Sequence, residues 1–250
     1  MKYRYSHTSA FTLIELLVVI AIIGVLVGLS TRGVLAGIAM AQSASCKSNL
    51  RQMIQAAHAY AAEHNGEMPP ARETNGDTGT KKTWEDILWG YDTRGRKGTD
   101  LKVCQCPSFH GDANWEEDRY TGYNYNASYV GVERFIHKGA VLNFGNPTRS
   151  AFLDRISSPE TCAVFGDGQY GKGANKFMRS PNPGPLDNGA GLASAGTQGF
   201  RHRGATNVAF ADGSVRSLDE CFTATASRND IATGCGFLSE DNALYSLDGQ

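Results

Sequence analysis

His202 and Asp212 are the side chains in this 250-residue sequence that best match an acid–base pair. An imidazole and a carboxylate can exchange protons near neutral pH. No nucleophile in a recognisable context accompanies them, however, and Asp212 with Gly213 already has a sufficient role as a turn dipeptide. We therefore expect both residues to be structural and the chain to have no catalytic residues.

The cysteines offer a second possible chemistry. They lie at positions 46, 104, 106, 162, 221 and 235, and an even number favours disulfides in an oxidising space. Cys221 and Cys235 would close a loop of about 15 residues, for which the entropy model predicts about 3 kcal/mol. Two alternatives remain. Cys104-x-Cys106 with His110 could bind zinc, although the usual C-x-x-C pairs are lacking, or the thiols are free and buried.

A single carboxylate, Glu15, interrupts the apolar run FTLIELLVVIAIIGVLVGL at residues 11 to 29. A charge in the bilayer centre costs roughly 3 kcal/mol, and less near the interface. One explanation is a side chain that snorkels to the interface. The other is an assembly contact, in which the carboxylate pairs with an opposite charge on a neighbouring subunit and sets the axial register.

Around these residues the sequence divides near position 64. Residues 11–31 suffice for a transmembrane helix, and Lys2 and Arg4 in the leader predict a cytoplasmic N-terminus with the bulk of the chain outside. From residue 47 to 63 apolar side chains recur every three or four positions, which indicates an amphipathic helix that Asn65–Gly66 ends. The formal net charge of -1 gives no reason to expect nucleic-acid binding.

The remainder is rich in turns and predicts a sheet. Residues 206–218 read as a hairpin around Asp212–Gly213, with Phe210 opposite Val215 and with one apolar and one solvated face. Residues 161–167 and 101–106 are further strand candidates, residues 84–91 suggest a short helix, and residues 171–199 suggest a long surface loop. We expect the sheet to cover the apolar face of residues 47–63.

The residues Ala10 and FTLIELLVVIAIIG closely resemble the class III signal of type IV prepilins and type II secretion pseudopilins. Further blocks at 46–70, 104–108, 122–131, 157–168 and 202–213 resemble the prepilin-type H-x9-DG family, whose motif is matched by His202, Asp212 and Gly213. The residue before the cut is usually Gly, whereas it is Ala10 here.

The resemblance implies a pilin-like α+β fold, with a long N-terminal helix packed on an antiparallel β-sheet domain. Its divisions are a leader at 1–10, a transmembrane or filament-core helix at 11–31, an amphipathic continuation at 32–65, and an extracytoplasmic β-rich domain at 66–250. A prepilin peptidase would cut between Ala10 and Phe11 and methylate Phe11. Glu15 would dock on a neighbouring subunit.

The same resemblance implies a single-pass inner-membrane protein that meets copies of itself or related subunits and an assembly platform, forming a secretion pseudopilus or pilus-like filament. No cofactor is expected. Calcium is considered because major pseudopilins often bind it, with Asp167, Asp212 and Asp219 as candidates, but the ligand spacing of an EF-hand is missing. The alternative is a surface protein that binds or processes polysaccharide. The tyrosines of residues 122–131 could stack on sugars, although packing is favoured for them.

Overall fold

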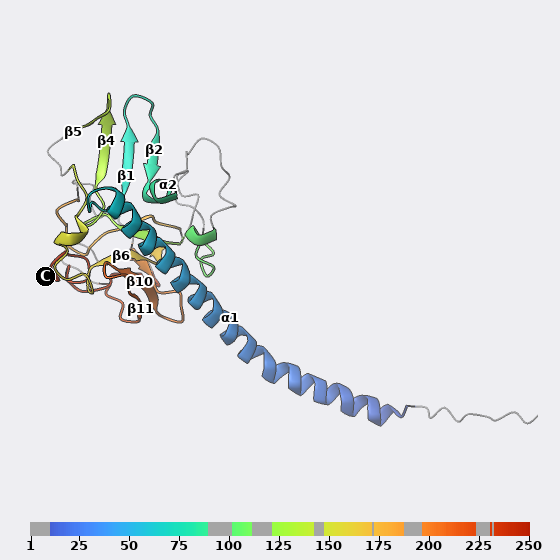
Figure 1. Ribbon diagram of the computed structural model, residues 1–250. Coiled ribbons are helices and arrows are strands. Elements are labelled where there is room, and N and C mark those ends of the chain that lie inside the picture. Colours follow the sequence, from blue (N-terminus) through green and yellow to red (C-terminus); the bar gives the residue numbers. More distant parts are fainter. Residues whose placement is uncertain are drawn as a thin grey trace, which may run out of the picture. The chain divides into compact units, whose positions relative to one another are not determined.

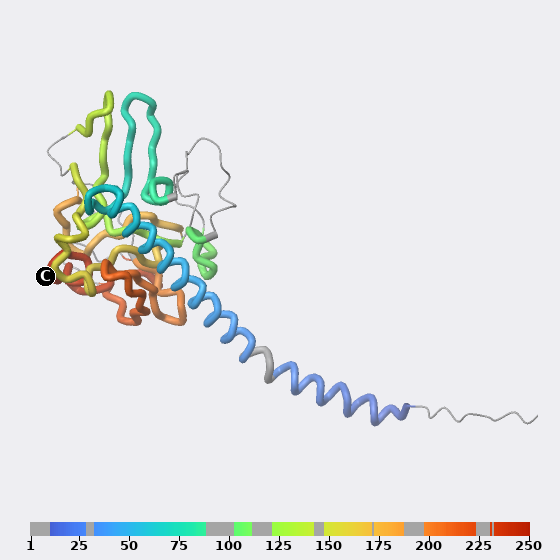
Figure 2. The backbone as a smooth tube through the Cα atoms, viewed as in Figure 1, coloured from blue at the N-terminus to red at the C-terminus, as the bar shows by residue number. Residues whose placement is uncertain are grey.

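The computed structural model describes residues 11–89, 102–111, 122–142, 148–171, 173–187, 197–223, 231 and 233–250 (Figures 1 and 2). For residues 29–32 and 89 only the backbone is described. The chain forms two compact units, Met1–Ala41 and Gln42–Gln250. The boundary falls inside the long helix, so the second half of that helix belongs to the globular unit.

The described elements are two α-helices, two short 3-10 helices and twelve strands. The helices are α1 (Leu13–Glu63), α2 (Trp84–Trp89), η1 (Lys102–Cys104) and η2 (Leu153–Arg155). The first six strands are β1 (Arg72–Asn75), β2 (Lys81–Thr83), β3 (Asn124–Asn126), β4 (Glu133–His137), β5 (Ala140–Leu142) and β6 (Ala163–Gly166). The others are β7 (Gly168–Gln169), β8 (Phe177–Met178), β9 (Thr197–Gly199), β10 (Thr206–Phe210), β11 (Val215–Leu218) and β12 (Cys235–Gly236).

The strands form three sheets. The largest has the order β11-β10-β6-β3-β8, the second β2-β1-β4-β5, and the third β12-β9-β7. Neighbouring strands are antiparallel except for the pairs β1–β4 and β3–β8, which are parallel. The predicted α+β architecture, a long N-terminal helix with mainly antiparallel sheets, is confirmed.

The second half of α1 packs on the largest sheet, as the amphipathic pattern predicts. Its buried side chains are those of Cys46, Leu50, Met53, Ile54, Ala57 and Ala61. They share one core with sheet residues such as Phe165 and Ala209, and β6, β10 and β11 lie beside this part of the helix in Figure 1. The helix ends before Asn65 and Gly66, whose φ values of 55° and 87° lie in the left-handed region.

The β10–β11 hairpin forms around its predicted turn, but its register differs from the prediction by one residue. Ala209, rather than Phe210, lies opposite Val215. The N–H of Phe210 donates to the carbonyl of Ser214 (2.9 Å), and the N–H of Gly213 donates to the carbonyl of Phe210 (2.9 Å). Gly213 has φ 86°. The loop is therefore a three-residue turn with a left-handed glycine, which shifts the pairing relative to a two-residue turn.

The prediction of a solvated face on this hairpin is wrong for β10, because all five of its residues are buried. Val208 and Phe210 pack in a second core with side chains from the C-terminal segment, namely Phe237, Leu238 and Tyr245. The Tyr245 hydroxyl accepts a hydrogen bond from the N–H of Leu238 (2.8 Å), which ties that segment together. β10 is therefore covered on both faces.

Two further local predictions are wrong and one is confirmed. The described part of residues 101–106 contains η1 instead of a strand, whereas the predicted short helix is present as α2.

Residues 173–180 are buried and supply β8, so this part of the predicted surface loop lies inside the unit. Its charges are paired: Lys176 with Glu85 (2.8 Å), and Arg179 with Glu133 (2.6 Å). Residues 188–196 of that prediction lie outside the described residues.

Candidate functional site

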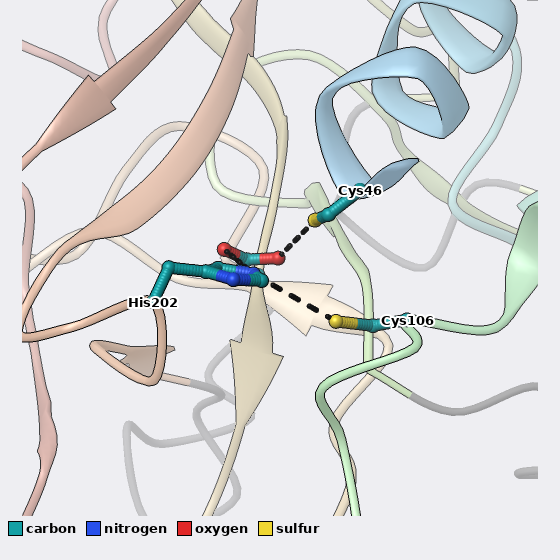
Figure 3. A group of neighbouring side chains, drawn as sticks. Cys46, Cys106 and His202 are labelled. Atoms are coloured by element: carbon teal, nitrogen blue, oxygen red, sulfur yellow. Dashed lines mark hydrogen bonds and ion pairs between the residues drawn. The ribbon is translucent and has the colours of Figure 1, made fainter. Parts of the chain in front are cut away.

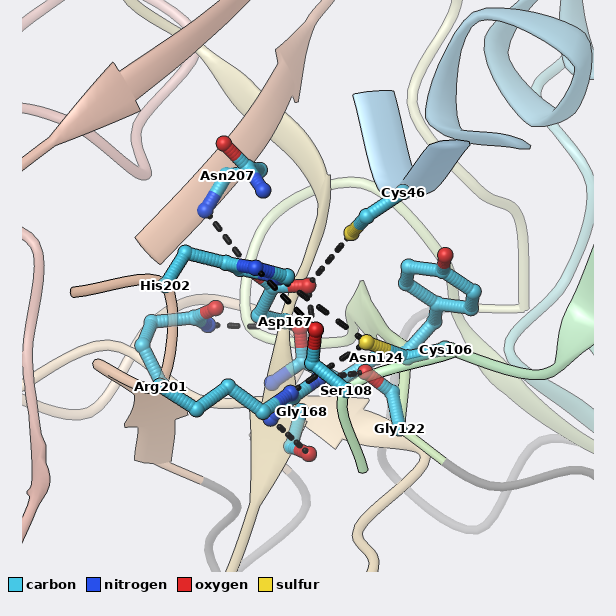
Figure 4. A network of polar contacts seen from close by, with 12 residues as sticks. Cys46, Cys106, Ser108, Gly122, Asn124, Asp167, Gly168, Arg201, His202 and Asn207 are labelled. Carbon is cyan, nitrogen blue, oxygen red and sulfur yellow. Dashed lines mark hydrogen bonds and ion pairs between the residues drawn. The ribbon is translucent and has the colours of Figure 1, made fainter. Parts of the chain in front are cut away.

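Four side chains with proton- or metal-binding atoms meet inside the globular unit (Figures 3 and 4). Cys46 lies on α1, Cys106 follows η1, Asp167 lies between β6 and β7, and His202 follows β9. Their sulfur, oxygen and nitrogen donor atoms all lie within 4.8 Å of one another. The exposed fractions are 0% for Cys46, 1% for Cys106, 0% for Asp167 and 7% for His202. We call these four residues the buried cluster.

Local structure aims two of these side chains inward. Cys46 lies on the face of α1 that packs in the core. His202 stands at the base of a tight turn: its N–H and carbonyl exchange hydrogen bonds with Ala205 (3.0 and 3.2 Å). The two residues between them, Arg203 and Gly204, have φ values of 59° and 86°. Positive φ at both central residues is the requirement of a type I′ turn, so the sequence HRGA fixes where the imidazole points.

Asp167 is held where backbones approach closely. A Cβ on the next residue, Gly168, would lie 2.2 Å from the carbonyl oxygen of Asn175, so a side chain larger than hydrogen does not fit there. The backbone N–H of Asn207 donates to Asp167 Oδ2 (2.7 Å). These contacts leave the carboxylate facing the other three members of the cluster.

Within the cluster, contacts converge on Asp167 and on one imidazole nitrogen. Cys46 Sγ donates to Asp167 Oδ1 (3.0 Å). His202 Nε2 lies 3.2 Å from Asp167 Oδ2 and 3.9 Å from Cys106 Sγ. The other imidazole nitrogen, Nδ1, lies 3.4 Å from Ser108 Oγ. In a catalytic triad the nucleophile contacts one imidazole nitrogen and the carboxylate contacts the other. Here Asp167 and Cys106 both face Nε2 of His202.

Arg201 compensates negative charge beside the cluster (Figure 4). Its Nε donates to Cys106 Sγ (3.3 Å) and its Nη2 to Asp167 Oδ1 (3.3 Å). Further hydrogen bonds run from the guanidinium to the carbonyls of Gly122 and Gly168. Arg201 is therefore fixed by backbone groups as well as by the two acidic members of the cluster.

These contacts perturb the proton affinities. The hydrogen bond with Cys46, aided by His202 and Arg201, lowers the pKa of the Cys106 thiol to about 5. Burial raises the pKa of Cys46. Burial opposes ionisation of Asp167, but Arg201 and His202 together lower its pKa. Burial likewise opposes charge on His202, yet Asp167 and Cys106 raise its pKa to about 9. These shifts favour the ionised forms of Cys106 and Asp167 and the protonated forms of Cys46 and His202.

The cluster is better suited to hold an ion than to attack a substrate. A thiolate beside an imidazolium resembles an activated nucleophile. Cys106 is only 1% exposed, however, so a dissolved substrate does not reach its sulfur in this conformation. Four converging donors, two of them sulfur, match the ligand types of a tetrahedral metal site.

The N-terminal segment shows a different local arrangement at Glu15. The helix α1 begins at Leu13. Thr12 Oγ1 accepts from the N–H of Glu15 (3.3 Å), and Glu15 Oε2 accepts from the N–H of Thr12 (2.9 Å) and from its hydroxyl (2.8 Å). This reciprocal pattern is a capping box. Glu15 therefore has a role within its own chain that the sequence reading missed, although T-x-x-E is the signature of that motif.

Apolar side chains of the first unit point outward on every side of the helix. Those from Phe11 to Val27 and from Val34 to Met40 include Phe11 at 75% exposure, Leu13 at 79% and Leu35 at 67%. In the part of the chain that the structure describes, α1 is the one helix long and apolar enough to cross a membrane. A helix that is apolar all round requires an apolar environment.

Residues 5–31 match the prokaryotic N-terminal methylation motif. This match supports a pilin-type protein that a prepilin peptidase processes, and together with the apolar helix it supports anchoring in a membrane. No curated protein and no solved structure matches the chain. Phe11 lies at the exposed start of the described chain, whereas Ala10 lies outside the described residues, so cleavage between them stays a prediction.

The structure places the residues of the H-x9-DG pattern in two different settings. His202 belongs to the buried cluster. Asp212 is exposed in the hairpin turn, where its Oδ1 accepts from the N–H of Ser214 (2.8 Å). Gly213 supplies the left-handed conformation of that turn. His58 of α1 contacts the adjacent carbonyl of Ala211 (3.0 Å from Nε2), so the turn also docks on the helix.

The cysteine predictions need correction. No disulfide joins any of the six cysteines, all of which lie in the described residues. Cys221 Sγ lies 3.6 Å from the carbonyl oxygen of Cys235, whereas Cys235 Sγ faces the carbonyl of Gly171 (3.8 Å), so the predicted disulfide is not formed. Of the zinc alternative built on Cys104, Cys106 and His110, only Cys106 belongs to the buried cluster.

Two other candidate binding sites fare differently. Tyr123 and Tyr125 are buried in the main core, at 1% and 0% exposure, which confirms packing and removes them as a sugar-stacking surface. The calcium candidates are not gathered at one place: Asp167 is buried in the cluster, whereas Asp212 and Asp219 are exposed on and beyond the hairpin. Calcium stays only an alternative to the expectation of no cofactor.

Sequence reasoning missed the buried cluster as a set. Cys46 and Asp167 are 121 residues apart, and Cys106 and His202 are 96 apart, so no local spacing reveals them. One signal was available. Each of the four residues falls in a different one of the blocks that resemble the H-x9-DG family, at 46–70, 104–108, 157–168 and 202–213.

Proposed function

We propose that this chain is a membrane-anchored, pilin-like structural subunit that assembles into a type II secretion pseudopilus or a type IV pilus-like filament. A prepilin peptidase cuts between Ala10 and Phe11 and methylates the new Phe11 amine. The observation that carries the proposal is the methylation motif at residues 5–31, because it overlaps a helix whose apolar side chains are exposed in the part of the chain that the structure describes.

The exposed apolar surface of the first unit suits two environments in succession. In the monomer, lipid covers these side chains, since about twenty apolar residues are needed to cross the hydrocarbon core. In the filament, helices of neighbouring subunits replace the lipid. Gly24, Gly28, Gly33 and Gly37 favour such contacts, because glycine has no side chain and lets helix backbones approach closely.

Glu15 has two roles in this proposal. Within its own chain it caps the start of α1 through Thr12. Between chains its negative charge attracts the Phe11 ammonium of a neighbour, and the low dielectric among apolar helices strengthens that attraction and penalises an unpaired charge. Capping needs a hydrogen-bond acceptor, whereas docking needs a charge, so the two roles can be separated by substitution.

Three variants separate them. Glu15→Gln keeps a capping residue but removes the charge, Glu15→Ala removes both, and Thr12→Val removes the capping hydroxyl but keeps the charge. We expect all three to be cleaved, with mass spectrometry showing a methylated Phe11 at the N-terminus. Both Glu15 variants should lower the amount of subunit in sheared filaments about tenfold or more, equivalent to about 1.4 kcal/mol of docking energy. Thr12→Val should assemble.

Wild-type assembly of Glu15→Gln would remove the charge from the mechanism and leave capping as the role of Glu15. A loss of assembly in Thr12→Val as severe as in Glu15→Gln would lead to the same conclusion. An uncut leader on the functional protein would contradict the proposal itself.

A further inference from the structure

We propose that Cys46, Cys106, Asp167 and His202 form a structural binding site for one divalent metal ion of the zinc class. The site is independent of filament assembly, because all four ligands come from one globular unit. Its failure and the failure of the proposed function are therefore separate experimental outcomes.

The donor atoms are close to the spacing that tetrahedral zinc requires. Zinc–sulfur bonds of about 2.3 Å and zinc–nitrogen or zinc–oxygen bonds of about 2.0–2.2 Å place neighbouring ligand atoms roughly 3.4–3.8 Å apart. In this structure Cys46 Sγ lies 3.0 Å from Asp167 Oδ1, whereas His202 Nε2 lies 3.2 Å from the other carboxylate oxygen, Oδ2, and 3.9 Å from Cys106 Sγ. One donor atom from each of the four residues lies within 4.8 Å of the others, so modest side-chain movements bring them to the spacing of a coordination shell.

The types of ligand select the metal. Two thiolates and an imidazole favour zinc and other borderline or soft ions, whereas calcium and magnesium require mostly oxygen ligands. Four protein ligands also fill a tetrahedral shell and leave no open position for water or substrate, which is the arrangement of structural rather than catalytic zinc.

Charge is balanced with the ion in place. Two thiolates and one carboxylate carry three negative charges, the ion supplies two positive charges, and Arg201 supplies the third through Cys106 and Asp167. Burial of the site therefore adds no uncompensated charge.

Groups behind the ligands fix their orientation, as is usual around bound metals. Ser108 Oγ lies 3.4 Å from His202 Nδ1, so it can accept the proton of that nitrogen while Nε2 faces the ion. The N–H of Asn207 donates to Asp167 Oδ2 (2.7 Å) and holds the carboxylate. Three of the four ligands are thus supported by a hydrogen bond to a residue outside the cluster, counting the bond from Arg201 to Cys106.

The ion would join four segments of the chain that are far apart in the sequence: α1, the turn after η1, the β6–β7 junction and the β9–β10 turn. Binding to the folded chain but not to the unfolded chain stabilises the fold. The site fastens α1 to the sheet near the start of the globular unit.

The test uses the full-length mature protein in detergent, purified with a thiol reductant and stripped with a chelator. Zinc content is measured by elemental mass spectrometry after dialysis, and Co²⁺ replaces Zn²⁺ for absorption spectra. We expect one ion per chain, a thiolate-to-cobalt charge-transfer band and the strong visible bands of tetrahedral cobalt. Cys106→Ser and His202→Gln should weaken zinc binding about 100-fold or more, and Ser108→Ala about 10- to 100-fold.

Cys104→Ser and His110→Gln are matched controls, because they lie beside the site in sequence but outside the buried cluster. Both should bind zinc like the wild type. Loss of zinc in these two variants would move the site to Cys104, Cys106 and His110 and overturn the proposal.

A further measurement uses only the wild-type protein, so it does not depend on whether the ligand variants fold. Zinc, but not calcium or magnesium, should raise the thermal midpoint of the stripped protein. It should also protect Cys46 and Cys106 from iodoacetamide at denaturant concentrations that open the stripped protein, while the exposed Cys221 reacts in both forms. Substoichiometric binding with no thermal shift, or a Cys46–Cys106 disulfide found by mass spectrometry in protein isolated without reductant, would overturn the proposal.

Discussion

Replacement of Lys176 by methionine should destabilise the globular unit strongly, because it removes the ion pair with Glu85 while the Glu85 carboxylate stays buried. Lys176 Nζ lies 2.8 Å from Glu85 Oε2, and the two side chains are 3% and 0% exposed. At an effective dielectric constant near 20, charges at that separation attract each other by about 6 kcal/mol, which offsets the cost of removing both from water. Removal of one partner from such a pair costs about 3–5 kcal/mol.

The measurement is guanidinium unfolding of the mature protein in detergent, followed by tryptophan fluorescence. Trp84 reports on the site directly, because its Nε1 donates to the carbonyl of Lys176 (3.0 Å) and its ring is fully buried. Lys176→Met should lower the free energy of unfolding by about 3–5 kcal/mol. The double variant Lys176→Met/Glu85→Met should recover most of that loss, because an apolar pair leaves no buried charge.

A matched control is the pair of Arg149 and Glu67, with an N–O distance of 3.9 Å, because the Arg149 side chain is 71% exposed and Glu67 keeps Arg134 as a second cationic partner. Arg149→Met should cost about 1 kcal/mol or less. The reasoning would be refuted if Lys176→Met cost no more than this control, or if the double variant were as unstable as the single one. Either result would mean that residues 173–180 are not held inside by paired charges.

Three further predictions concern the core, the hairpin and alkaline pH. Met53→Ala should lower the free energy of unfolding by about 2–5 kcal/mol, because Met53 is fully buried. Gln52→Ala, on the exposed face of α1, should change that free energy by about 0.5 kcal/mol or less. The same denaturant titration measures both. Gly213→Ala should cost about 1–2 kcal/mol, because φ at this position is 86°; a thermal midpoint equal to that of the wild type would contradict the assigned turn. Burial raises the pKa of Tyr125 and Tyr245, so above about pH 10 the unfolded chain loses protons that the folded chain keeps. The free energy of unfolding should then fall by about 1.4 kcal/mol per pH unit for each tyrosine. A free energy of unfolding that does not change above about pH 10 would count against this.

Features decided by neighbouring residues were predictable from the sequence. The amphipathic spacing from residue 47 to 63 identified the buried face of α1, and Asn65–Gly66 identified its end, because left-handed residues stop a helix. The turn at Asp212–Gly213 was also predictable. Its register was not, since the same dipeptide fits a two-residue and a three-residue loop, and each loop places a different residue opposite Val215.

Features decided by distant residues were not predictable in this way. Residues 173–180 have the composition of a loop, yet they are buried. Lys176 and Arg179 can be buried there because they form ion pairs with Glu85 and Glu133 on other elements. The second face of β10 is covered by the C-terminal segment, whose apolar residues are too few and too widely spaced to indicate a partner. The buried cluster follows the same rule, because each of its members looks ordinary among its sequence neighbours.

The position of Cys46 connects the proposed anchor with the proposed metal site. The globular unit begins at Gln42, and Cys46 is the first fully buried residue of α1 within it. In a filament held together through the first half of α1, force on a subunit enters its globular unit along this helix. Packing in the core resists such a load through many weak contacts, each sensitive to small displacements. Metal–thiolate bonds at Cys46 would add a strong, directional attachment at the point where the load enters, and the ligands on three other segments would distribute it across the sheet.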